Sequence, residues 1–150
     1  MQPRSGMPAR IADQQPPGRD AAFRHAILEV YDYRCAACGV RVLPNQELSL
    51  VEAAHLIPFG VSRNDKPTNG MALCPNHQWA MDRHLIAPCP DDKRRAGVWR
   101  INGERLYERI DGQRDLVSLK GKPVIPPREV KFYPATESLQ WREQHLATAA

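Results

Sequence analysis

At 150 residues the chain is long enough for one domain with a hydrophobic core and short for two. Its 14 prolines and 9 glycines predict a loop-rich fold, and its formal net charge of +4 is compatible with a polyanionic partner without identifying one. The sequence has no apolar run of about 18 residues and no signal-peptide core near its start, so we expect no membrane partner and a cytoplasmic location. There, four cysteines are expected to bind a metal ion rather than to form disulfides.

The N-terminal part of the chain divides into a polar tail and a helix. Residues 1–18 are rich in Pro, Gln, Gly and Arg and are predicted to be a disordered tail or linker, which leaves 19–150 as one domain. Asp20 is expected to be the N-cap of a helix over about 21–31, with His25 on its surface. The apolar residues of that helix recur at helical spacing, at Phe23, Ile27, Val30 and Tyr31.

The middle of the chain predicts short strands around a long loop. Two β-rich runs, 39–43 and 48–56, flank a Pro-Asn turn and are expected to form a hairpin. Residues 58–70 carry many Gly, Asn, Asp and Pro and must form a loop. A short strand at 70–74 then leads into a helix at 75–85, with proline in its first turn.

The C-terminal part predicts a second hairpin and a final helix. Asn102 and Gly103 lie between β-rich arms in 98–110, which is a strong hairpin signal. The remaining segments are expected as strand and turn at 115–125, extended chain at 126–134, and helix at 135–149. Leu139 and Leu146 lie on one face of that helix.

Two short-spaced pairs of ligand residues predict a zinc site. Cys35 and Cys38 form a Cys-x-x-Cys pair, and Cys74 and His77 form a Cys-x-x-His pair 35 residues further on. Four such ligands on two tight turns suit tetrahedral zinc, and because they leave no open position the metal is expected to be structural. Cys89 competes with His77 for the fourth position, although no second ligand stands near it at turn spacing. Four buried residues without a metal are the plainer alternative.

An isolated histidine lies between the two zinc pairs. His55 ends an apolar strand, and such a histidine is often a core residue that is hydrogen-bonded to a carbonyl group. However, a long Gly- and Asn-rich loop follows it, and Asn69 precedes a helix that carries Asp82. This grouping favours a functional site.

The residues AHLIP, NG and LCPNHQWAMD together resemble the HNH endonuclease family, of the ββα-metal class, in its zinc-bound subgroup. The resemblance covers about residues 20–88, and the segment after position 125 is similar to tails of bacterial HNH proteins. It implies an α+β fold: a small ββα-metal nuclease core with a structural zinc, followed by a C-terminal β-hairpin plus helix. The core motif would span 35–84 and the extension 90–150.

The resemblance also implies a reaction. His55 would be the general base that takes a proton from water, and Asn69 would fix the loop and orient His55, or lend its side-chain oxygen to a metal. A Mg²⁺ or Mn²⁺ ion would stabilise the leaving 3′ oxygen during hydrolysis of DNA. Bacterial relatives often serve in restriction or phage defence. The sequence leaves open whether the protein acts as a homodimer or with a separate specificity domain.

The sequence departs from the family pattern at the expected catalytic cation. Ala54 stands where many members have Asp or Glu, and Glu52 either substitutes for it or is a solvated surface residue. Gln78 stands where the family often has a second histidine. Asp82 lies one helical turn after Gln78 and is a suitable hard ligand, with His84 as an alternative.

Basic residues in the motif are expected to contact DNA phosphates: Arg63, Lys66 and Arg83, with Lys93, Arg94, Arg95 and Arg100 after it. An ordinary solvated surface is the plainer alternative. Trp79 is expected in the core, while Trp99 and Tyr107 are expected to pack on strands rather than to stack on bases. The competing functions are a non-catalytic zinc-stapled nucleic-acid-binding module and a zinc domain for protein interaction.

Overall fold

The computed structural model describes residues 17–148. In chain order it contains α1 (Pro17–Val30), β1 (Glu52–His55), α2 (Phe59–Ser62), η2 (Pro67–Asn69), β2 (Gly70–Leu73), α3 (Pro75–Asp82), β3 (Ile86–Cys89), β4 (Val98–Ile101), α4 (Gln113–Val117), η3 (Val130–Phe132) and α5 (Thr136–Thr148), where η marks a 3-10 helix. No helix in residues 17–148 combines the length and the apolar character needed to cross a bilayer.

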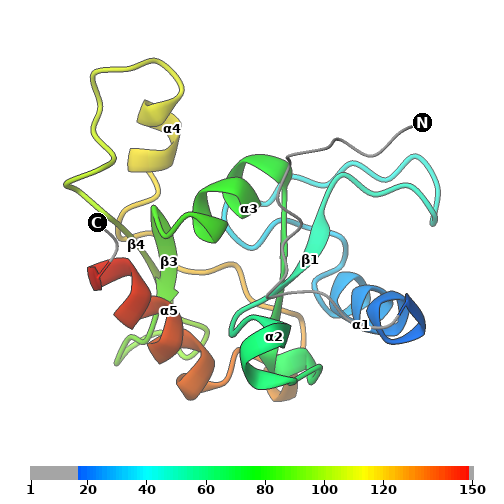
Figure 1. Ribbon diagram of the computed structural model, residues 1–150. Coiled ribbons are helices and arrows are strands. Elements are labelled where there is room, and N and C mark those ends of the chain that lie inside the picture. Colours follow the sequence, from blue (N-terminus) through cyan, green and yellow to red (C-terminus); the bar gives the residue numbers. More distant parts are fainter. Residues whose placement is uncertain (1–16, 149–150) are drawn as a thin grey trace, which may run out of the picture.

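Two small antiparallel sheets carry the fold. Strand β1 pairs with β2, and β3 pairs with β4. Figure 1 shows α1 beside the first pair, α5 against the second, and α3 between the two. The predicted order of strand, loop, strand and helix is confirmed in β1, β2 and α3, and with it the α+β class and the small ββα core.

Helix α1 packs against the β1–β2 sheet. Its inward side chains are Phe23, Ile27, Leu28 and, just beyond the helix, Tyr31, with Val30 partly buried. His25 is exposed, as predicted. The predicted N-cap is wrong, because the helix begins at Pro17 and Asp20 lies in its first turn, where a carboxylate complements the helix dipole. Of the predicted disordered tail, residues 1–16 lie outside the described residues.

The predicted hairpin of 39–43 with 48–56 is wrong. That stretch has only a bridge between Asn45 and Leu48 and one further hydrogen bond, from Leu50 N to Val42 O. Val42, Leu48 and Leu50 are exposed, so strand pairing in this stretch would gain little from burial of apolar side chains. Strand β1 pairs instead with β2, whose four residues are all buried.

The predicted turn at Asn102 and Gly103 is also not a hairpin turn, because β4 pairs with β3, which the sequence did not indicate. Gly103 does not adopt the positive φ that such a turn needs. Asn102 instead accepts hydrogen bonds from the backbone N–H groups of Glu104 and Arg105, at 3.2 and 3.3 Å. Its side chain therefore ends the strand, as Asn commonly does in turns.

The rest of the C-terminal extension differs in part from expectation. Residues 115–125 were expected as strand and turn; the turn is present at 118–121, but in place of a strand they contain the end of α4 and a single bridge between Val98 and Pro123. The extended segment 126–134 contains the 3-10 turn η3. The final helix is confirmed as α5, which packs on β3 with Leu139 and Leu146 buried.

Candidate functional site

The four predicted zinc ligands converge at one place. Cys35 and Cys38 lie in the turn after α1, Cys74 directly precedes α3, and His77 lies in its first turn. Their ligand atoms all lie within 4.8 Å of one another. The distance from His77 Nδ1 is 3.2 Å to Cys74 Sγ and 3.8 Å to Cys35 Sγ, and the Cys38 and Cys74 sulfurs are 4.0 Å apart.

These spacings fit a zinc ion. Bonds of about 2.3 Å to sulfur at tetrahedral angles put ligand atoms about 3.8 Å apart. A hydrogen bond from Cys74 is the main cause that lowers the pKa of Cys35 to about 3, and the same bond raises the pKa of Cys74. The cluster could therefore hold zinc through one imidazole and three thiolates, which would tie the turn after α1 to the start of α3.

Cys89 does not join this cluster. It is fully buried in β3, and its thiol donates to the Ala87 carbonyl oxygen at 3.6 Å. Burial is the main cause that raises the pKa of Cys89 to about 12. In the described residues it is His77, not Cys89, that lies with the three other cysteines, and Cys89 is a free thiol.

His55 lies at the end of β1 as part of a packed cluster. Its ring stacks on Phe23, with ring centroids 3.8 Å apart and an interplanar angle of 5°, and Phe59 lies on another side at 5.7 Å. Its Nε2 is 2.9 Å from Asp65 Oδ1. The His55 side chain is 2% exposed, whereas that of Asp65 is 21% exposed. The imidazole is therefore shielded from solvent, and Asp65 is the more exposed member of the pair.

Asn69 holds the loop that follows β1. Its Oδ1 accepts hydrogen bonds from Ile57 N at 2.9 Å and Ser138 Oγ at 2.8 Å. Its Nδ2 donates to the carbonyl oxygens of Ile57 and Asn64, both at 3.0 Å. The fully buried amide thus fastens both ends of the segment 57–64. Because Oδ1 already has two donors, this geometry suits loop anchoring better than metal binding.

Gly70, the cross-strand partner of His55, leaves no room for a side chain. A Cβ at this position would lie 2.7 Å from Ile27 Cγ1 and 2.8 Å from Phe23 Cζ, which is the ring that stacks on His55. We expect Gly70→Ala to lower the free energy of unfolding by about 1–3 kcal/mol, because α1 must move outward. Urea unfolding of the zinc-loaded protein measures this.

Gly103→Ala is the matched control for that variant. A Cβ there meets nothing within 4 Å, and the residue lacks a positive φ, so its stability should stay within about 0.5 kcal/mol of the wild type. Equal stability of the two variants would show that the contact between α1 and β2 is looser than described.

The acidic residues expected to hold a catalytic cation do not belong to any group of three or more Cys, His, Asp or Glu ligands in residues 17–148. Glu52 is exposed, and its Oε1 is 2.6 Å from Arg24 Nε on α1. Gln78 is buried on α3, and Asp82 ends that helix half-buried. In residues 17–148 the Cys₃His cluster is the one group of three or more Cys, His, Asp or Glu ligands that could hold a metal, and Glu52 and Asp82 lie outside it.

His84, the alternative ligand, faces α5. Its ring centroid is 5.5 Å from that of His145 and 6.3 Å from that of Trp141. Its positive φ of 60° is uncommon outside glycine. Burial, and next the charge of Arg142, lowers the pKa of His84.

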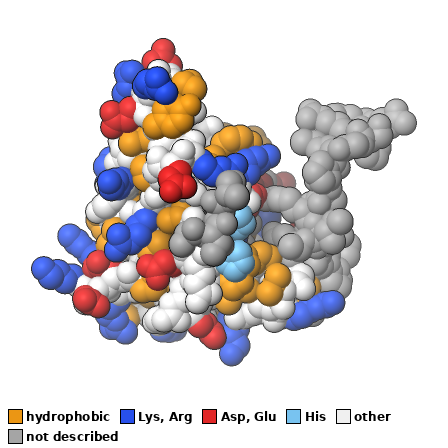
Figure 2. Space-filling view, turned by 60° about the vertical axis from the view of Figure 1, so that its left-hand side comes forward, with side chains coloured by type: hydrophobic (Ala, Val, Ile, Leu, Met, Phe, Trp, Pro, Cys, Tyr) orange, Lys and Arg blue, Asp and Glu red, His pale blue; other side chains and the backbone are white. Residues whose placement is uncertain are grey.

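The predicted phosphate contacts lie on the surface. Arg63 and Lys66 flank Asp65 in the loop after α2, and Arg83 follows α3 with its guanidinium 4.4 Å from the Trp79 ring centroid. The expectation that Trp79 lies in the core is wrong, since it is 49% exposed. Figure 2 shows basic and acidic side chains interspersed over one face, without a broad surface of a single sign.

Three residues near the site were missed in the sequence. Asp65 was counted only as a loop residue, although it lies between two basic residues in the loop that follows His55. Ser138 and Arg142 lie on α5, far along the chain, and both contact the core. An i, i+4 pair of polar residues on the buried face of a helix was the available signal. The expected strand packing of Trp99 is confirmed, because it is fully buried.

Comparison with known proteins agrees with this arrangement. A modification-dependent TagI restriction endonuclease has a similar structure, with a TM-score of 0.58 and 18% identity over 90% of this chain, a likeness that concerns the fold alone. The chain spans only about 41% of that enzyme's length. No curated protein sequence matches the chain. Residues 35–87 match the family model described as HNH endonuclease, which confirms the resemblance of this segment to the HNH endonuclease family.

Proposed function

We propose that the chain is a metal-dependent DNA endonuclease in which His55 is the general base. The observation that carries the proposal is the His55–Asp65 pair, 2.9 Å apart at the end of β1, within a segment that matches the HNH endonuclease model. In the free protein this carboxylate fixes the orientation and the tautomer of the ring.

In this proposal His55 takes a proton from the water that attacks the scissile phosphate. Asn69 holds the loop that carries Asp65, through its bonds to Ile57 and Asn64. The carboxylates of Asp82 and Asp65 are the hard oxygen ligands that Mg²⁺ and Mn²⁺ prefer, with Gln78 as a further oxygen donor and the ion-paired Glu52 as the weaker candidate. A bound cation would neutralise charge on the phosphate and stabilise the leaving 3′ oxygen.

Access to His55 requires the Asp65 loop to move. The His55 side chain is 2% exposed, and the partly exposed Asp65 carboxylate covers its Nε2. We propose that DNA and the cation draw this carboxylate away from the ring. Surface loops commonly close or open in this way when substrate binds, and catalytic hydrogen bonds often take their final form only in the complex.

The same loop carries two proposed phosphate contacts. Arg63 and Lys66 stand on either side of Asp65, and both are exposed. Arg83 lies exposed at the end of α3, immediately after Asp82. Basic side chains on the two segments that flank the site would place a DNA strand across it.

The burial of His55 favours a second candidate, a zinc-stapled module that binds nucleic acid without cutting it. In that case the imidazole is a core residue whose Nε2 is paired with Asp65, and Ala54 and Gln78 mark a lost cation site. Phosphate contacts from Arg63, Lys66 and Arg83 would then provide binding alone.

Incubation of the purified protein with supercoiled plasmid separates the two candidates. The nuclease should nick or linearise the plasmid when Mg²⁺ or Mn²⁺ is added and leave it intact when the zinc-loaded protein receives no further divalent cation. Intact plasmid with every divalent cation, together with salt-dependent binding, would instead support the binding module. Intact plasmid without binding would support a zinc domain for protein interaction.

The biological setting stays a proposal as well. The neighbour in structure is a restriction enzyme more than twice as long as this chain, so we propose a role in restriction or defence with specificity supplied by a separate domain or by a second copy. A cytoplasmic location is part of this proposal, because the zinc-binding thiols must stay reduced.

A further inference from the structure

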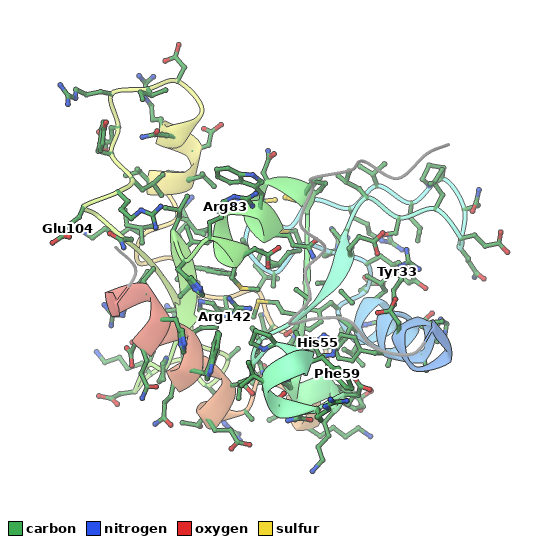
Figure 3. The ribbon with its side chains drawn as sticks, viewed as in Figure 1. Tyr33, His55, Phe59, Arg83, Glu104 and Arg142 are labelled. Atoms are coloured by element: carbon green, nitrogen blue, oxygen red, sulfur yellow. The ribbon has the colours of Figure 1, made fainter. Side chains whose placement is uncertain are left out.

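Helix α5 reaches the nuclease core from outside the segment that matches the family model. The Ala135 amide, just before the helix, donates to the Thr68 carbonyl oxygen at 2.9 Å. One turn on, Ser138 Oγ donates to Asn69 Oδ1 at 2.8 Å. One turn further, Arg142 extends inward from the same face, as Figure 3 shows. Three successive turns therefore contact the proposed site.

Arg142 connects the two elements that carry the proposed catalytic groups. Its NH2 group donates to the carbonyl oxygen of His55 at 3.0 Å, at the end of β1. Its NH1 group donates to the carbonyl oxygen of Met81 at 3.2 Å, one residue before Asp82 on α3. A single rigid guanidinium thus holds the backbone of the proposed base and the backbone beside the proposed cation ligand.

The surroundings of Arg142 make this connection a stiff one. The residue is 4% exposed, so its two bonds to carbonyl oxygens lie away from competing water. A buried guanidinium needs such partners, because its desolvation is costly without them. The planar fork also has a fixed angle between its two N–H groups, so it sets the separation of the two carbonyl oxygens.

We propose that Arg142 is a positioning residue that sets the distance between the His55 imidazole and the cation site at Asp82. The inference rests on the proposed nuclease function. A displacement of about 1 Å between reacting groups commonly costs about 100-fold in rate, so the consequence should appear in turnover rather than in DNA affinity. The extension beyond residue 87 is then part of the active site.

Two variants test this. Arg142→Lys keeps the positive charge but reaches one carbonyl oxygen, and it should lower the single-turnover rate of plasmid cutting about tenfold. Arg142→Met loses both bonds and should lower the rate about 100-fold. In both, the Kd for DNA should stay within about twofold of the wild type. Arg128→Met, which removes an exposed guanidinium that lies 3.5 Å from Asp32 and outside the proposed site, is the control and should cut at the wild-type rate.

Zinc content and thermal unfolding of each variant show whether it is folded, and Arg142→Lys carries the test where Arg142→Met does not fold. A folded Arg142→Lys that cuts at the wild-type rate, or loses rate only in proportion to DNA affinity, would overturn the inference and leave the proposed function standing. A wild-type protein that does not cut would overturn both.

Discussion

Removal of zinc is expected to unfold the domain. Binding of structural zinc is worth about 10–16 kcal/mol in small zinc domains, which is comparable to or larger than the whole stability of a domain of this size. Cys35 lies in the turn after α1 and Cys74 precedes α3, so loss of the metal disconnects two elements of the core. It also leaves buried thiols, Cys35 and Cys74, close together.

Titration with a strong chelator, followed by circular dichroism and by the zinc content of the protein, measures this effect. Cys74→Ala should behave as the chelated protein does. Cys89→Ala is the matched control, because this cysteine is equally buried and lies outside the cluster. It should keep one zinc per chain and lose about 1–2 kcal/mol, as for a small buried side chain. A chelated protein that unfolds at the wild-type temperature would refute a structural metal.

Replacement of His55 is expected to have the second-largest effect. Loss of a general base typically lowers the rate by about 10²–10⁴-fold, and His55→Gln keeps most of the side-chain volume while it removes the base. DNA affinity should stay close to the wild-type value, because Arg63, Lys66 and Arg83 are unchanged. Initial rates of plasmid cutting measure the loss of catalysis, and binding isotherms measure the DNA affinity.

His25→Gln serves as the control for that variant. His25 lies on the exposed side of α1, so its loss should leave both cutting and stability unchanged. Because His55 stacks on Phe23, its variant is also checked for thermal unfolding and zinc content. A folded His55→Gln protein that cuts at the wild-type rate would rule out His55 as the base.

The zinc ligand set could be predicted because metal spacing is local. Two x-x pairs each fit on a tight turn, and a shared metal ion would explain why distant turns meet. The α5 helix could be predicted for a similar reason, since Leu139 and Leu146 repeat at helical spacing and both are buried. In each case the evidence lies within a short stretch of sequence.

Strand pairing could not be predicted in the same way. The Asn102–Gly103 signal was strong locally, yet β4 found a better partner in β3, where Ile86 and Cys89 are fully buried. Residues 39–43 include types that favour strands, but Val42 is exposed, so the segment does not gain the burial that would stabilise a strand there. Which candidate strands pair depends on how much surface they bury in the folded protein, and a local sequence pattern carries no information about that burial.

The contacts around the proposed site were also out of reach of the sequence. Asp65 meets His55 only because the loop is folded back by Asn69. Arg142 meets His55 across 87 residues of chain. A sequence motif identifies the residues that would take part in the chemistry. The residues that hold them in place can lie far away in the sequence, and only the fold brings them to the site.

The central claim is that the His55 base lies beside a cation that is held at Asp82. Manganese broadens the NMR signals of protons near it, so titration of the zinc-loaded protein with Mn²⁺ tests the claim directly. The account predicts that the ring-proton signals of His55 broaden well before those of His25, and that Asp82→Ala abolishes the difference. If the His55 signals stay sharp at a Mn²⁺ concentration that supports cutting, or broaden equally in Asp82→Ala, the cation lies elsewhere and the account is contradicted.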